Sequence, residues 1–143
     1  MKGQRVPDSD HVSRYCKPSA MEDGLPLVAA FLMRQGESYL SVNWLEYLRT
    51  RDLSSAVDMV RARFLKQSYG LKANGRFVVL NVGRCRSAAL RIQRHLRIKH
   101  IPLKADDSHS GIYGMSEDGF SVATEMRALV CQDDVHPALH SQS

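Results

Sequence analysis

The chain has few cysteines, and no hydrophobic run in it is long enough to cross a membrane. It has 143 residues, and its three cysteines, Cys16, Cys85 and Cys131, are odd in number and far apart. This spacing excludes a disulfide scaffold and predicts a reducing, cytoplasmic compartment. The longest apolar runs fall well short of the ~18–20 residues of a membrane helix, and the first ten residues are too polar for a secretory signal. We therefore expect a cytoplasmic protein with no membrane partner.

Acidic residues are absent between Met59 and Ala105. This acid-free stretch contains twelve basic residues: Arg61, Arg63, Lys66, Lys72, Arg76, Arg84, Arg86, Arg91, Arg94, Arg97, Lys99 and Lys104. Such a block repels itself unless an anionic group neutralises it. The pattern leaves four candidates: nucleic acid, an acidic protein partner, the acidic C-terminal third of the chain itself, and solvent ions alone.

The first half of the sequence predicts strands followed by a helix. Residues 1–24 have no strong hydrophobic period, so we expect an irregular N-terminal arm with a short strand at residues 11–15. Residues 27–33 are wholly apolar and residues 38–42 alternate, which indicates two strands of a hairpin. Asn43 and Glu46 have the spacing of a capping box, which predicts a helix that begins near Trp44.

The second half predicts alternating helices and strands. Apolar residues recur at helical spacing in residues 53–64, with Asp52 as cap, and again in residues 84–96. Residues 77–82 and 98–103 indicate strands, residues 106–114 a loop, and Ser116 the cap of a last helix. The order predicts an α+β (or α/β) fold with a small mixed β-sheet covered by about four helices. A single domain is expected over residues 25–132, followed by a frayed tail at residues 133–143.

A cysteine and an arginine have the spacing of a phosphatase loop. Cys85 and Arg91 follow a predicted strand and are separated by five residues, as in cysteine-dependent phosphatases. The five intervening residues contain no glycine, however, and they continue a helical pattern. The sequence therefore favours a buried structural cysteine at position 85.

Histidine spacing gives little support for a metal site. His136 and His140 are four residues apart, and His95 and His100 are five apart. A structural zinc site needs four ligands, usually in short-spaced pairs, and no cysteine lies close to another here. We expect no metal and no cofactor.

Three polar segments contain the groups that general acid–base chemistry uses. They are residues 10–15, residues 41–43 with Glu46, and residues 106–111. The catalytic candidates in them are His11, Arg14, His109 and Ser110. In this hypothesis His11 and His109 act as acid and base, and Arg14 holds an anionic substrate.

The favoured hypothesis is a binding or accessory module rather than an enzyme. The basic segment from Arg84 to Lys104 would contact nucleic acid or an acidic protein. The candidate anion-binding residues are Arg84, Arg86, Arg91, Arg94, Arg97, Lys99 and Lys104. Two alternatives remain open: the metal-independent enzyme built on the His11, Asn43 and His109 segments, and a structural or oligomer-forming subunit with Tyr39, Trp44 and Tyr47 as interface aromatics.

Overall fold

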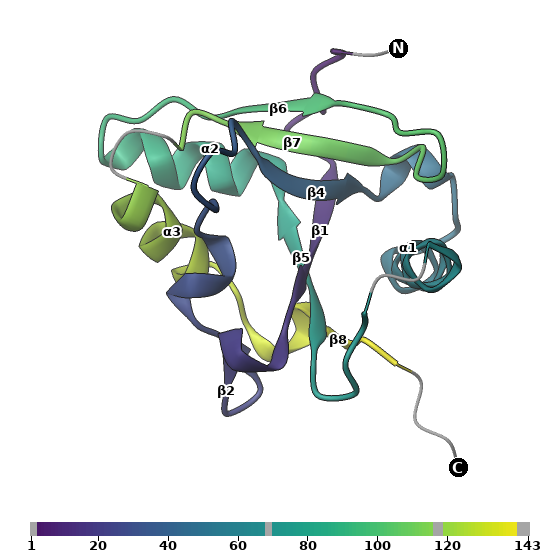
Figure 1. Cartoon of the computed structure of the whole chain (residues 1–143). Coiled ribbons are helices and arrows are strands. Elements are labelled where there is room, and N and C mark those ends of the chain that lie inside the picture. Colours follow the sequence, from purple (N-terminus) through teal and green to yellow (C-terminus); the bar gives the residue numbers. More distant parts are fainter. Residues whose placement is uncertain (1–2, 68–69, 116–118, 140–143) are drawn as a thin grey trace.

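A six-stranded sheet forms the centre of the fold (Figure 1). The structure, a computed structural model, describes residues 3–67, 70–115 and 119–139. The strand order is β6-β7-β4-β1-β5-β8, and all five pairings between neighbours are antiparallel. The strands are β1 (His11–Cys16), β4 (Leu40–Trp44), β5 (Arg76–Asn81), β6 (Arg97–His100), β7 (His109–Tyr113) and β8 (Val135–Pro137). A separate two-stranded sheet pairs β2 (Met21–Glu22) with β3 (Leu25–Pro26).

The two faces of the sheet carry different helices (Figure 1). The helices are α1 (Leu53–Lys66), α2 (Val82–Arg91) and α3 (Gly119–Ala128), with 3-10 turns η1 (Pro18–Ala20), η2 (Val28–Phe31), η3 (Glu46–Leu48) and η4 (Gln132–Asp134). On β1, Val12 belongs to a core cluster that contains residues of α2, α3 and η2. Ser13 and Tyr15 point to the opposite face, where α1 packs through its own apolar cluster. We call these the α2/α3 face and the α1 face.

The helices predicted at residues 53–64 and 84–96 are both present. The second helix begins and ends earlier in the sequence than predicted. In α1 the stripe residues Ala56, Val57 and Val60 are buried, and Asp52 caps the helix by accepting a hydrogen bond from the Ser55 amide. The second helix, α2, begins at Val82, earlier than expected, because Asn81 is its cap and accepts from the Arg84 amide at 2.9 Å. It ends at Arg91.

The α+β class is confirmed, but the expected count of about four helices is wrong. Three α-helices are present in the part of the chain that the structure describes. The missing one was expected to begin near Trp44, where only the short turn η3 forms. It does not form because Asn43 and Glu46, the two residues of the expected capping box, bond to distant residues instead.

The expected hairpin of residues 27–33 and 38–42 is also wrong. Residues 28–31 form η2, which packs against α3. Ala30 and Phe31 are buried there, so the apolar run reflects burial of a 3-10 turn rather than a central strand. The second expected strand does exist as β4, but it pairs with β1 and β7.

Long-range pairing orders three segments that the sequence indicated to be irregular. The N-terminal segment holds β1, which extends the expected strand to Cys16 and lies between β4 and β5. The expected loop at residues 106–114 contains β7, and the tail contains β8, which pairs with β5. The strand expected at residues 98–103 is β6 and ends at His100. The expected cap, Ser116, lies outside the described residues.

The helices are short compared with a membrane span. In residues 3–67, 70–115 and 119–139, none is both long enough and apolar enough to cross a bilayer.

Candidate functional site

Polar side chains from three neighbouring strands line one cavity on the α1 face. Ser13 of β1 lies opposite Asn43 of β4, and Asn43 lies opposite His109 of β7. Ser41 is two residues from Asn43, so it points to the same face and is a diagonal neighbour of His109. These four side chains line a cavity of about 250 Å³, with Arg14 among the other residues of its wall. We call it the His109 cavity.

His109 is held in one tautomer with its second ring nitrogen toward a serine. Its Nδ1 lies 2.9 Å from the backbone carbonyl oxygen of Ile101, which can only accept a hydrogen bond. In the neutral ring Nδ1 is therefore the donor and Nε2 the acceptor. The Nε2 atom lies 3.4 Å from the Ser41 hydroxyl oxygen. Contacts between a base and a nucleophile are often this long before substrate binds.

Asn43 fixes the loop that precedes His109. Its amide nitrogen lies 2.8 and 3.0 Å from the two carboxylate oxygens of Asp106, and 2.9 Å from the Ser108 hydroxyl. All three residues are buried. These hydrogen bonds connect the β6–β7 loop to β4. They therefore fix the position of His109, the first residue of β7.

Ser13 contributes an unsatisfied hydroxyl to the wall of this cavity. The residue is 1% exposed, and its hydroxyl oxygen has no hydrogen-bond partner among the described residues. A buried hydroxyl without a partner costs about 1–3 kcal/mol, and such groups in native proteins call for an explanation. A polar group of a bound ligand would supply the missing hydrogen bond.

Arg14 places a fixed positive charge beside the cavity. Its Nε donates to the Ala30 carbonyl and its Nη1 to the Ser41 carbonyl, both at 2.7 Å. Burial lowers the pKa of this guanidinium, whereas the nearby Cys16 and Glu37 side chains raise it. Arginine stays protonated in proteins, so the group remains a cation. Arg34 lines the same cavity and adds a second positive charge.

A glycine lets an aromatic ring pack against His109. The Tyr39 ring lies 5.9 Å from the His109 ring and 5.2 Å from the Tyr113 ring, measured between centroids. A Cβ atom at Gly111 would lie 2.6 Å from the Tyr39 ring and 2.9 Å from Ile101. Only glycine at position 111 allows this packing.

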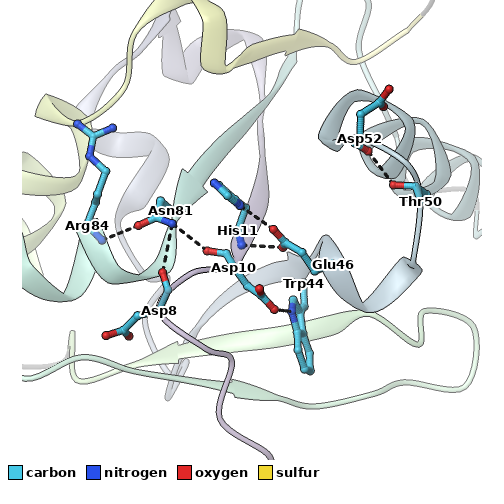
Figure 2. A network of polar contacts seen from close by, with 9 residues as sticks. All are labelled: Asp8, Asp10, His11, Trp44, Glu46, Thr50, Asp52, Asn81 and Arg84. Atoms are coloured by element: carbon cyan, nitrogen blue, oxygen red, sulfur yellow. Dashed lines mark hydrogen bonds and ion pairs between the residues drawn. The ribbon is translucent and has the colours of Figure 1, made fainter.

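His11 lies in a different polar network (Figure 2). Its Nδ1 is 2.6 Å from Oε2 of Glu46, and its backbone amide donates to Oε1 of the same carboxylate at 2.7 Å. It lines a separate cavity with Asn81 and Arg84. His11 and His109 are two strands apart in the sheet and two residues apart along the strand direction. This geometry puts their Cα atoms about 12 Å apart. The structure therefore does not bring the two histidines together as an acid–base pair.

Ser110, another catalytic candidate, points away from the His109 cavity. It follows His109 on β7, so its side chain lies on the α2/α3 face. The residue is fully buried, and its hydroxyl donates to the Ser108 carbonyl at 3.1 Å. Of the four catalytic candidates, Arg14 and His109 line the His109 cavity. Arg14 follows Ser13 on β1, so its side chain leaves the sheet toward the α2/α3 face, where it donates to the Ala30 carbonyl.

The seven candidate anion-binding residues come from two sides of the sheet. The α2 helix carries Arg84, Arg86 and Arg91, and Arg94 follows it. The β6 strand carries Arg97 and Lys99, which lie opposite β7 residues of the α1 face, and Lys104 follows this strand. Several already have partners within the chain. Arg86 pairs with Asp8 at 2.7 Å, Arg91 lies 3.9 Å from Glu125, and the Lys99 ammonium lies over the Tyr113 ring.

Cys85 is a structural residue of α2. It is 1% exposed, and burial raises the pKa of its thiol to about 12, with Arg84 opposing the shift. Residues 82–91 are helical, so no wide phosphate loop surrounds the sulfur. The expected buried cysteine is confirmed.

Within residues 3–67, 70–115 and 119–139, no group of three or more His, Cys, Asp or Glu side chains is placed to bind a metal ion. His140 of the expected histidine pair lies outside the described residues.

Ser13 and Ser41 lie within two of the polar segments that the sequence indicated, but neither was a named catalytic candidate, and Arg34 lies outside all three segments. The available signal was polar residues at alternate positions inside otherwise apolar strands, as at Ser41 and Asn43 of β4. That signal shows which side chains share a face, but not which strands are neighbours. No protein-family model, curated protein or solved structure matches this chain. Function must therefore be argued from the chemistry of the site.

Proposed function

We propose that the chain is a small ester hydrolase in which Ser41 is the nucleophile and His109 the general base. The observation that carries this proposal is the pairing of a tautomerically fixed imidazole with a serine hydroxyl on the wall of a cavity. A hydroxyl is a weak nucleophile until a base removes its proton. Nε2 of His109 is the acceptor nearest to that proton.

The reaction proceeds through a covalent intermediate. The Ser41 oxygen bonds to the electrophilic centre of the ester while its proton passes to Nε2 of His109. The bond to the leaving oxygen then breaks, and that oxygen takes the proton from His109. A water molecule releases the covalent product by the same route, with His109 again as base. The Ile101 carbonyl holds the ring orientation throughout.

Positive charge in the wall selects an anionic substrate. Arg14 and Arg34 line the cavity, and Arg14 is fixed by two backbone carbonyls. Fixed cations stabilise negative charge that develops in a transition state without having to reorganise first. The unsatisfied hydroxyl of Ser13 is available to a polar group of the substrate.

Labelling with a fluorophosphonate tests the nucleophile without knowledge of the natural ester. We expect one covalent adduct per chain, located on Ser41 by peptide mass spectrometry. The variants Ser41→Ala and His109→Gln should lose the adduct. Ser87→Ala, which removes an exposed hydroxyl outside the cavity, is the matched control and should leave labelling intact. An adduct on Ser13, or labelling that survives His109→Gln, would contradict the proposal.

A second candidate is the binding module built on the basic segment. Arg84, Arg97 and Lys104 support it because their side chains are exposed. Backbone-led binding to nucleic acid weakens steeply with salt. Titration of mixed single- and double-stranded nucleic acid from low to high salt tests it, with Arg91→Glu and Arg94→Glu combined expected to abolish binding. Salt-independent binding, or none at low salt, would reject nucleic acid as the partner and leave the acidic C-terminal third of the chain or an acidic protein to neutralise the segment.

The oligomer hypothesis and the cytoplasmic location also stay proposals. Trp44 is buried, with its ring against Tyr47 and His100. Tyr39 is half-buried, and Tyr47 is exposed. Sedimentation velocity across the micromolar range tests for self-association.

A reducing compartment is supported by the three cysteines, all of which are free thiols.

A further inference from the structure

A second and larger cavity adjoins the His109 cavity and is lined by positive charge. Its volume is about 430 Å³, and four cationic residues line it: Arg14, Lys17, Arg34 and Lys72. Among the described residues of its wall there is no Asp or Glu. Four like charges around one space favour a ligand with more than one negative charge. We call it the cationic cavity.

The two cavities share part of their walls. Arg14, Tyr15 and Arg34 line both of them. Tyr15 is held in place because its hydroxyl accepts a hydrogen bond from the Lys72 backbone amide at 3.0 Å. A molecule that occupies the cationic cavity therefore contacts residues that also line the cavity of Ser41 and His109.

The remaining wall of the cationic cavity is mostly apolar. Ala20, Ala29, Ala30 and Leu32 line it beside the cations. Small-molecule sites typically combine such apolar surface with a few fixed polar groups, in volumes of about 300–1,000 Å³. This wall suits the carbon skeleton of a small organic anion.

We propose that the cationic cavity binds the phosphate group of a small phosphorylated molecule, whose separate carboxylic ester then lies in the His109 cavity. The assignment rests on the proposed function for the site of reaction, but not for the binding of phosphate. A phosphate monoester carries close to two negative charges at neutral pH, with three acceptor oxygens for Arg and Lys donors. A sulfate ester, or each phosphodiester of a nucleic acid, carries one. The charge of the cavity therefore favours a terminal phosphate over a nucleic-acid backbone.

Calorimetric titration with phenyl phosphate and phenyl sulfate tests the charge argument directly. We expect saturable binding of phenyl phosphate at least 10-fold tighter than that of phenyl sulfate. Lys17→Gln combined with Lys72→Gln should weaken phenyl phosphate binding at least 10-fold. The matched control is Arg51→Gln with Lys66→Gln, which removes two exposed cations outside the cavity and should change binding less than twofold.

Three results would overturn the assignment. They are equal affinity for phosphate and sulfate esters, an equal loss in the control pair, and displacement of phenyl phosphate by a 12-nucleotide single-stranded DNA at lower concentration. Ser41→Ala separates this proposal from the proposed function. That variant should bind phenyl phosphate like the unmodified chain, whether or not Ser41 proves to be a nucleophile.

Discussion

The side-chain nitrogen of Asn43 lies 2.8 and 3.0 Å from the two carboxylate oxygens of Asp106, although the residues are 63 positions apart. Asp106 is 2% exposed, and Asn43 is 3% exposed. The amide supplies the donors that a buried carboxylate needs. It also joins β4 to the loop before β7, which brings Ser41 and His109 onto one cavity wall.

Replacing this amide with a carboxylate should destabilise the fold in a pH-dependent way. In Asn43→Asp two carboxylates face each other in a buried site, so the pKa of at least one is raised. We expect a loss of about 3 kcal/mol or more at pH 7, because the buried Asp106 carboxylate loses its amide donor and faces a second buried negative charge. A raised folded-state pKa makes protonation favour the folded state, so the deficit should shrink as the pH falls toward 5. Urea unfolding at pH 7 and pH 5 measures it, and a deficit that grows on acidification would contradict the argument.

The three cysteines should differ sharply in reactivity. Burial raises the pKa of the Cys16 and Cys85 thiols to about 12, and both residues are 1% exposed. Cys131 is exposed. Because the thiolate is the reactive form, iodoacetamide at pH 8 should alkylate Cys131 alone in the folded protein, and all three cysteines in urea. Mass mapping checks this, and rapid native alkylation of Cys85 would revive the phosphatase hypothesis.

The stability of the chain should fall as His136 becomes protonated. Burial, followed by the charge of Arg61, lowers the pKa of this β8 histidine from its ordinary value of 6.5. The unfolded chain therefore binds the proton more readily, so stability is lost as the pH falls from about 6.5 toward the lower folded pKa. His136→Gln removes this titration. Thermal unfolding between pH 7.5 and 5.5 should show a smaller decrease in Tm for the variant, and equal decreases would contradict the assignment.

Local sequence patterns predicted the helices well, because apolar residues that recur at helical spacing indicate that one face of the helix is buried. The Leu53–Lys66 stripe and the cap at Asp52 depend only on residues within one or two turns of each other. The same reasoning failed at Asn43 and Glu46. Their capping-box spacing is correct, but Asn43 bonds to Asp106 and Glu46 bonds to His11, and both partners are more than 30 residues away.

Strand neighbours, and so the candidate site, could not be predicted from local pattern. The polar positions Ser13, Ser41 and His109 were visible, and alternation fixes which face each occupies within its own strand. Their convergence depends on the strand order β7-β4-β1, which joins residues up to 96 positions apart. The hypothesis of an acid–base pair chose the two histidines by residue type, whereas the fold pairs His109 with a serine.

A methyl group at position 111 should disturb both the fold and the site. In Gly111→Ala the new Cβ would lie 2.6 Å from the Tyr39 ring, which packs against His109. Overpacking of this kind costs about 1–3 kcal/mol. If the ring moves, His109 loses a packing partner, so fluorophosphonate labelling of Ser41 should slow as well. Gly119→Ala is the matched control, because a Cβ there meets no atom within 4 Å and should leave labelling unchanged. Denaturant unfolding and labelling rates measure the two effects, and a Gly111→Ala variant that matches the control in both would show that Tyr39 does not position the base.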